Sequence, residues 1–539
     1  MDSIVPPVCS CRGMQTGYDG AREDRDVFDC GGCSVTQPFE VTRREFIAAA
    51  AAVLGCGAES SSAAAANSDE LIDLSAEDAV AALKRGDITA ERYATALLAQ
   101  CERGELLNAF ITLDREKLLQ AAREADTRRR KGAKLGALHG LPIPVKDSVN
   151  TKDYRTTGGT AALREFVPME DAAIVRRLKD AGAIVMGKTN LHELSFGWTS
   201  NNLAFGAVHN PFDTKRIPGG SSGGTAVAVA TRMAPLGIAE DTEGSIRVPA
   251  AMCGIAGFRP TTGRYPTTGV VPISELFDQV GPHARTVADL ALFDSVATGE
   301  WKAIAAKSLK GVKLGVGRGY WFGGLDAQVE GIANEALRKL QDAGVELVEA
   351  EVPELAALIE ATTGPVQSHD TMYTLRKYLS EYKTGVTFEQ LVAKLSADVK
   401  RDFERDILPG GKGFITDEVY RNAVDVALPK LKKNFRDYFA RTGVAAIIFP
   451  ATMVVPPLIG EDQEVSIGGK KVSFETAVAR NIAPGSTAGL PGLVLPAALT
   501  ADGLPIAVEL DGPAGTDRAV LALGLSVQRV LGRVAGPKT

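Results

Sequence analysis

The sequence predicts an α/β fold in which helices surround a largely buried β-sheet. Between residues 141 and 190 the apolar run LPIPV is followed by the helical pattern DAAIVRRLKDAG and by strand-like AIVMGKTN. Short apolar strands that alternate with helices are typical of a sheet covered on both faces. Near the C-terminus, LPGLVLPAALTADGLPIAVELDG predicts two strands joined at Asp502-Gly503, a hairpin signal.

Helical patterns precede and follow this region. Ser75 is expected to cap a helix that begins at Ala76, and two more amphipathic helices follow before residue 132. Residues 326–441 are helical and more charged, and we expect them to cover the functional site as a cap. A buried strand at 444–449 and a last helix at 517–532 complete the expected domain.

Composition excludes some classes of function. The chain has 539 residues, is 45% hydrophobic and 23% charged, and carries a formal net charge of -6. Without a basic footprint, nucleic-acid binding is not expected. No apolar run reaches the roughly eighteen residues of a membrane span. The sequence therefore predicts a globular protein with a sizeable core.

Residues 1–67 form a leader of different character. The stretch TRREFIAAAAAVLGC places Arg43 and Arg44 before an apolar core, and a serine-rich, alanine-rich segment follows. This pattern resembles a twin-arginine export signal, which predicts that the leader is removed or disordered and that the protein works in the periplasm or cell envelope. Cys56 follows a loose lipoprotein box, so a lipid anchor there is an alternative.

The cysteines predict no metal centre and no disulfide framework. Cys101 and Cys253 fall in the main domain, where Cys253 lies in an apolar run and is expected to fill core volume. CxC and CxxC spacing would permit zinc binding, but it falls within the leader, at Cys9, Cys11, Cys30 and Cys33.

The stretch PGGSSGGTAVAVATRMAPLGIAEDTEGSIRVP, residues 218–249, concentrates the chemistry. Four glycines flank Ser221 and Ser222, a small-residue run suited to a tightly packed helix follows, and a second loop carries Gly244 and Ser245. Clustered glycines beside a serine suggest a turn that presents a hydroxyl together with several backbone N–H groups. Such a turn suits acyl transfer, in which a nucleophile and an oxyanion hole share one loop.

Lys146 is the candidate base. It ends the apolar run LPIPV, which would bury its stem. Burial disfavours the charged ammonium and lowers the pKa of a lysine from about 10.4 toward neutrality. A neutral lysine at this place could accept the proton of a serine.

Two other serine patterns are weaker. Residues 220–224 fit GxSxG, with Ser222 as the nucleophile, but the elbow of that motif needs a preceding strand and NPFDTKRIPG is a proline-containing loop. Ser380 and Lys383 fit SxxK, yet the KTG motif that should lie far away shares the same lysine. Chance explains this second match better.

Lys146, GGSSGG at 219–224 and DTEGSIRVPAAMCGIAGFRPT at 241–261 together resemble the amidase signature family, from about Leu71 to the C-terminus. The resemblance implies a single α/β/α sandwich domain, residues 68–539, around a large twisted mixed β-sheet. It also implies a Ser-cisSer-Lys triad that cleaves amides without metal or cofactor. The matching positions make Ser245 the nucleophile, Ser221 the bridging serine and Lys146 the base.

The resemblance extends to the residues around the nucleophile. Ser222 would be a neighbour of the triad, and Asp241 and Arg247 would hold the loop rigid through charge-assisted hydrogen bonds. The oxyanion hole would be made by backbone N–H groups, those of Thr242, Glu243, Gly244 and Ser245.

Glu243 departs from the family pattern, which usually has two glycines before the nucleophile. A non-glycine residue at positive φ costs on the order of 1–2 kcal/mol, and a carboxylate aimed at an oxyanion would oppose it. We therefore hypothesise that Glu243 keeps an ordinary backbone conformation and turns its side chain away, toward solvent or a polar substrate group.

The expected activity is hydrolysis of a carboxylic amide to an acid and an amine or ammonia through an acyl-enzyme. The context FRPTTGRYPTTGVVPIS resembles hydrolases of arylacetamide-type substrates such as indoleacetamide and mandelamide. A small-molecule amide is the expected partner; an esterase side activity and a homodimer are left open. Two alternatives are the glutamine-hydrolysing subunit of a tRNA amidotransferase and an envelope binding protein whose catalysis Glu243 has impaired.

Overall fold

The structure is a computed structural model that describes residues 68–538. The leader therefore lies outside the described residues. So do the predictions made on it: the twin-arginine pair, the lipid anchor at Cys56 and the four cysteines with zinc-like spacing.

One mixed β-sheet runs through the described domain. It has eleven strands in the order β1-β3-β2-β6-β8-β7-β14-β15-β11-β9-β10. Their bounds are β1 Phe110–Leu113, β2 Pro142–Lys146, β3 Ile184–Thr189, β6 Leu236–Asp241, β7 Ala256–Arg259, β8 Gln279–Ala284, β9 Lys313–Val316, β10 Glu346–Glu349, β11 Ala446–Pro450, β14 Gly492–Leu499 and β15 Pro505–Asp511.

Parallel and antiparallel pairs both occur, as the sequence predicts. The alternating stretch folds as β2, helix α6 (Ala173–Asp180) and β3, and β2 pairs in parallel with both β3 and β6. The C-terminal pair β14 and β15 forms the expected antiparallel hairpin. Because β2 and β6 are neighbours inside the sheet, the residues that end these two strands are brought together.

Helices cover both faces of the sheet, which confirms the predicted α/β/α arrangement. On β14, Gly492 approaches Arg247 of helix α8 (Arg247–Met252), whereas the next side chain, Leu493, packs against Gly524 of helix α20 (Asp517–Leu531). Successive residues of a strand point to opposite faces, so α8 and α20 belong to opposite layers. Helix α7 (Gly223–Ala230) contacts α8, while α9 (Val287–Thr298) and α11 (Ala327–Asp342) contact α20.

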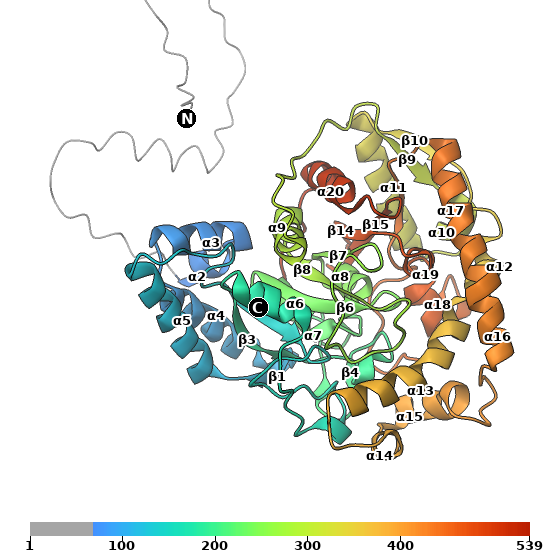
Figure 1. Ribbon diagram of the computed structural model, residues 1–539. Helices are drawn as coiled ribbons and strands as arrows, with labels where there is room; N and C mark the ends of the chain where they lie inside the picture. The colour runs from blue at the N-terminus through green and yellow to red at the C-terminus, as the bar shows by residue number, and fades with distance from the viewer. Residues whose placement is uncertain (1–67, 539) are drawn as a thin grey trace, which may run out of the picture. The chain divides into compact units, whose positions relative to one another are not determined.

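The N-terminal helices gather beside the β1 and β3 edge of the sheet (Figure 1). The predicted cap is present: the Ser75 side chain accepts a hydrogen bond from the Asp78 N–H at the start of α3. The bounds are α2 Ser68–Ile72, α3 Ala76–Arg85, α4 Ala90–Arg103 and α5 Arg115–Arg130.

Residues 326–441, expected to be a helical cap, divide into two parts. The first part belongs to the sheet layers, because α11 packs on β11 and β15 and β10 forms the edge strand. The second part is helical and contributes to the wall of the cavity described below. Its helices are α12 Leu355–Glu360, α13 Thr363–Glu381, α14 Phe388–Ala393, α15 Ala397–Asp402, η4 Phe403–Ile407, α16 Asp417–Asn422, η5 Ala423–Ala427 and α17 Leu428–Thr442.

Short elements complete the described chain. Two small hairpins, β4 with β5 and β12 with β13, stand apart from the main sheet. These and the remaining helices are β4 Asn201–Asn202, β5 Gly206–Ala207, β12 Glu464–Ile467, β13 Lys470–Ser473, η1 Glu105–Leu107, η2 Ala161–Leu163, η3 Glu193–Ser195, α10 Arg318–Trp321, α18 Phe474–Ala479 and α19 Ala483–Ala488.

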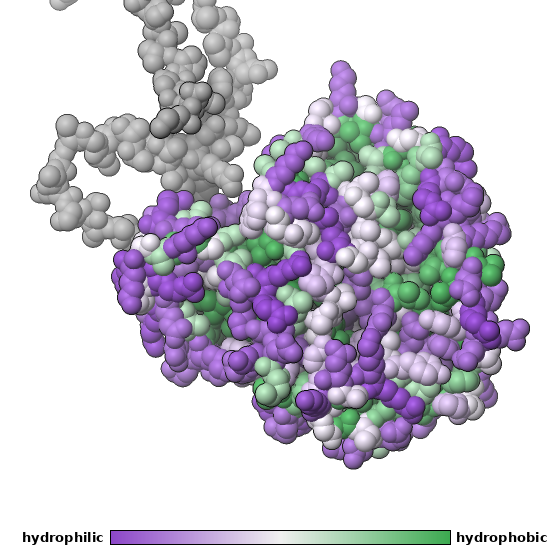
Figure 2. Space-filling model, viewed as in Figure 1, coloured by the Kyte–Doolittle hydropathy of each residue, from purple (hydrophilic) through white to green (hydrophobic). Residues whose placement is uncertain are grey.

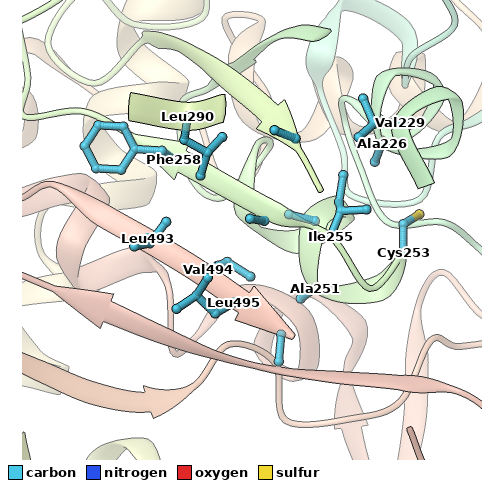
Figure 3. Close-up of a cluster of buried hydrophobic side chains, with 14 of the residues drawn as sticks. Ala226, Val229, Ala251, Cys253, Ile255, Phe258, Leu290, Leu493, Val494 and Leu495 are labelled. Carbon is cyan, nitrogen blue, oxygen red and sulfur yellow. The ribbon is translucent and has the colours of Figure 1, made fainter. Parts of the chain in front are cut away.

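The main core lies between the sheet and its helices. Figure 3 shows Phe258 and Leu493 on neighbouring strands, with side chains of α7, α8 and α9 around them. Cys253 is fully buried in this cluster and is a free thiol, as expected of a residue that fills core volume.

Polar and charged side chains cover most of the face seen in Figure 2, with apolar ones scattered among them. Within residues 68–538, none of the helices combines the length and the apolar character that crossing a membrane requires.

Candidate active site

Lys146 is the last residue of β2, an interior strand of the sheet. Every residue of that strand is buried, and the lysine side chain has no exposed surface. Its Nζ lies 2.6 Å from Ser221 Oγ and 2.7 Å from Glu240 Oε1. The structure thus brings together the two sequence-predicted residues Lys146 and Ser221, and it adds a carboxylate.

Burial and the neighbouring carboxylate act on Lys146 in opposite directions. Burial lowers the pKa of the ammonium, and the negative charge of Glu240 raises it. Burial is the larger effect, so the pKa of Lys146 lies below the ordinary value of 10.5.

Ser221 stands in the glycine-rich loop before α7, after a cis peptide bond between Gly220 and Ser221. Gly224, in the first turn of α7, shows why this loop needs small residues. A Cβ at Gly224 would lie 2.4 Å from the backbone oxygens of Ala109 and Asn190. Only glycine therefore allows the start of α7 to pack so closely against the segments that precede β1 and follow β3.

Ser222 points away from the cavity. Its side chain is fully buried and donates to the backbone oxygen of Glu240 over 3.1 Å. The residues before it form no strand, so the strand-to-helix elbow required by the GxSxG interpretation is absent from this described segment.

Ser245 lies on the loop between β6 and α8, where Gly244 adopts a φ of 102°. Ser245 faces the cavity and is 4% exposed. The two serine loops are linked by the Ser222 N–H, which donates to the Ser245 backbone oxygen over 3.3 Å. In the described part of the chain no hydrogen bond joins the hydroxyls of Ser221 and Ser245.

Asp241 holds the loop that carries Ser245 through hydrogen bonds and ion pairs. Its carboxylate accepts hydrogen bonds from the N–H of Gly244 over 2.7 Å, from the N–H of Ile246 over 3.0 Å and from Arg247 Nε over 3.0 Å. A second guanidinium, Arg259, lies 3.3 Å away, and none of the three charged side chains is exposed. Burial alone would raise the pKa of Asp241, but Arg247 and Arg259 outweigh it and lower the pKa to about 2.

The expected oxyanion-hole donors fall into two groups, one already hydrogen-bonded and one at the cavity. The Gly244 N–H is occupied by Asp241. Thr242, Glu243 and Ser245 line the cavity, and their backbone N–H groups remain the expected donors.

Glu243 does not take a positive φ, and Gly244 beside it supplies the left-handed backbone instead. The Glu243 carboxyl accepts a hydrogen bond from Gln367 Nε2 over 2.6 Å and lines the cavity instead of reaching solvent. Burial, followed by the negative charge of Glu475, raises the pKa of Glu243 to about 8. The conformation matches the ordinary backbone hypothesised for this residue, while Gln367 holds its side chain.

A cavity of about 580 Å³ opens above Ser245. Residues between 364 and 415, from helices α13, α15 and η4 and the loop after them, supply one wall. Six apolar side chains line it, namely Phe196, Trp198, Ile273, Pro365, Ile415 and Phe474. Acidic side chains line it as well, namely Glu243, Asp398, Asp402, Asp406, Asp462 and Glu475.

Sequence reasoning missed Glu240 and Gln367. A signal for Glu240 was present, since it is a carboxylate inside the otherwise apolar strand LGIAED, one residue before Asp241. No sequence signal marks Gln367, because only the fold brings α13 to the nucleophile loop.

A family profile described as "Amidase" matches residues 92–521, which is most of the chain. The chain belongs to the amidase family. Two curated relatives support this. An indoleacetamide hydrolase of Agrobacterium vitis is 37% identical over 449 residues, covering 83% of this chain and 95% of the relative. A mandelamide hydrolase of Pseudomonas putida is 37% identical over 487 residues, covering 88% and 94%.

Solved structures share the fold of this amidase. A peptide amidase from Stenotrophomonas maltophilia has a TM-score of 0.70 at 26% identity, and the match covers 86% of this chain and 98% of that protein. Family, relatives and fold together make this chain an enzyme that hydrolyses amides.

Asp241→Asn tests whether the buried charge network holds the nucleophile loop. The substitution leaves two buried guanidinium groups short of one negative charge, so we expect the free energy of unfolding to fall by about 3 kcal/mol or more. Because the pKa of Asp241 is lowered to about 2, its contribution is present above the unfolded pKa and lost as the pH falls toward 2.

Urea unfolding of this variant is compared with Asp502→Asn, an exposed carboxylate in the β14–β15 turn. The control should change stability by less than about 0.5 kcal/mol. Equal stability of the two variants would show that Asp241 does not brace the loop.

Proposed function

We propose that this amidase cleaves aryl or arylacetamide-type carboxylic amides through an acyl-enzyme formed on Ser245. Ser221 would relay the proton of Ser245 to neutral Lys146. The single observation that carries this proposal is the contact of 2.6 Å between Lys146 Nζ and Ser221 Oγ, buried at the end of strand β2.

The proton path follows from donor and acceptor chemistry. A neutral lysine amine has one lone pair, and the Ser221 hydroxyl can donate to it while accepting from Ser245. Ser245 then attacks the amide carbon, and the resulting ammonium returns the proton through Ser221 to the leaving nitrogen. Water next hydrolyses the ester bond by the same route in reverse.

The tetrahedral intermediate needs hydrogen-bond donors for its negative oxygen. The N–H groups of Thr242, Glu243 and Ser245 are proposed to supply them, with Gly244 held by Asp241 as a rigid pivot. Losing one donor of an oxyanion hole typically costs about 3 kcal/mol of transition-state stabilisation. A loop held by a buried ion pair keeps such donors in place before the reaction begins.

The side chains that line the cavity favour a substrate with an aromatic acyl group. Phe196, Trp198 and Phe474 line the space in front of Ser245, and aromatic rings pack favourably against one another. The relatives named for indoleacetamide and mandelamide agree with this choice.

The alternatives are weaker. An impaired binding protein would need Glu243 to spoil the oxyanion hole, yet its carboxyl is bound to Gln367 and its backbone is ordinary. A glutamine-hydrolysing subunit of a tRNA amidotransferase would work in the cytoplasm with a partner subunit. The export-like leader speaks against that second alternative.

Labelling with a fluorophosphonate tests the nucleophile. The wild-type protein should form one covalent adduct on Ser245, and Ser245→Ala should form none, as measured by intact mass and peptide mapping. Ser221→Ala should slow labelling by about 10²–10⁴-fold, the usual worth of general acid–base catalysis.

Ser380→Ala is the matched control for labelling, since Ser380 is exposed on α13 and belongs to the SxxK pattern. Labelling of this control should equal that of wild type. Adduct formation on a residue other than Ser245 would overturn the assignment, and an unreactive wild type would favour the binding protein.

The pH profile tests the base. Protonated Lys146 cannot accept a proton, so hydrolysis of an aryl amide should fall about tenfold per pH unit below the pKa of this lysine. Because burial lowers that pKa below 10.5, the plateau should begin below that value. Full activity well below about pH 5 would contradict a lysine base.

We further propose that the chain is exported by way of the twin-arginine pair in its leader. Replacing both residues, Arg43→Lys with Arg44→Lys, should retain the full chain in the cytoplasm of a host that carries a twin-arginine transporter. Arg25→Lys, outside the pair, is the control for cell fractionation. Unchanged export of the double variant would remove this proposal.

A further inference from the structure

Glu240 is a buried carboxylate inside the active site for which the proposed mechanism has no role. It precedes Asp241 on β6 and is 2% exposed. One of its oxygens, Oε1, accepts hydrogen bonds from Lys146 Nζ over 2.7 Å, from Ser148 Oγ over 3.4 Å and from the Ser195 hydroxyl. Glu240 therefore contacts the amine of the proposed base directly.

The contact with Glu240 fixes the orientation of the Lys146 amine. An ionised carboxylate only accepts hydrogen bonds. When Lys146 is neutral, one N–H must point at Glu240 Oε1, and the amine lone pair is then free to receive the hydroxyl hydrogen of Ser221. When Lys146 is charged, the same carboxylate compensates the positive charge of the ammonium, which burial without a partner would disfavour.

We propose that Glu240 is a positioning residue that aims the lone pair of Lys146 at Ser221 and stabilises the ammonium formed when Ser245 gives up its proton. This inference rests on the proposed function. Glu240 itself neither gains nor loses a proton in the cycle. One proton moves from Ser245 to Ser221 while another moves from Ser221 to Lys146. When the amine leaves, Lys146 returns a proton to Ser221, and Ser221 gives its proton to the leaving nitrogen.

Other charged groups near Lys146 cannot replace Glu240. Asp241 and Asp278 also favour the ammonium, but only Glu240 touches Nζ. Asp241 is engaged by Arg247 and Arg259, while Asp278 accepts from Thr242 over 2.6 Å. The two nearby imidazoles, His192 and His283, have pKa values lowered mainly by burial and are therefore largely uncharged near neutral pH.

Glu240→Gln tests the inference, because it keeps the shape and an acceptor oxygen but removes the charge. The readout is the second-order rate of fluorophosphonate labelling of Ser245 as a function of pH, measured on the full chain. Loss of an opposite charge in contact should lower the pKa of Lys146 by about 1–3 units, so the acidic limb should move to lower pH by that amount. The plateau rate should fall, since the ammonium is no longer neutralised.

Two further variants separate charge from structure. Glu240→Asp keeps the charge and should hold the limb nearer the wild-type position than Glu240→Gln does. Glu193→Gln is the matched control, because Glu193 is similarly buried but accepts from the Ser396 N–H over 2.9 Å, and within the described residues it makes no hydrogen bond or ion pair with Lys146. The acidic limb of the pH profile of this variant should stay at the wild-type position.

Ser195→Ala decides the matter if Glu240→Gln fails to fold. Removing this donor concentrates negative charge on Glu240 and should move the limb to higher pH. An acidic limb that does not move, or moves the opposite way, in the folded variants overturns the role of Glu240. A wild-type protein without any acidic limb, or without labelling at Ser245, would instead overturn the proposed function.

Discussion

The structure depends on one buried contact, the amine of Lys146 held between the Ser221 hydroxyl and the Glu240 carboxylate. Burying an ammonium away from water costs free energy. The cost is avoided only when a partner of opposite charge lies beside it or when its pKa shifts so that the group is neutral. Burial lowers the pKa of Lys146 and Glu240 raises it. The balance between these two effects lets one side chain both accept and return a proton.

The sheet explains how residues far apart in the sequence reach this contact. Lys146 ends β2 and Glu240 lies on the neighbouring strand β6, which pairs with β2 in parallel. Glycine on β6 lets helix α7 pack closely against this strand, because a Cβ at Gly237 would lie 2.6 Å from Thr225, and the loop before α7 carries Ser221. Asp241 and Arg247 hold the backbone of the loop between β6 and α8, which carries Ser245.

Much of this site could be predicted from the sequence. An apolar run ending in lysine, glycines around a serine pair and a glycine before Ser245 are local signals, and each has a local physical reason. Glu240 stands out in the sequence as an acidic residue in a largely apolar strand, but its role, like that of Gln367, depends on tertiary contacts. The helical pattern of residues 326–441 likewise does not reveal that helix α11 packs on the sheet and that strand β10 joins its edge, because both are tertiary contacts.

The most direct test is the titration of Lys146 itself, observed by NMR in protein labelled with ¹³C at lysine Cε and assigned with Lys146→Met. We predict that the resonance missing from the variant, that of Lys146, titrates below 10.5, the ordinary lysine pKa. A Lys146 resonance that titrates at or above that value would contradict a lysine base at the centre of this enzyme.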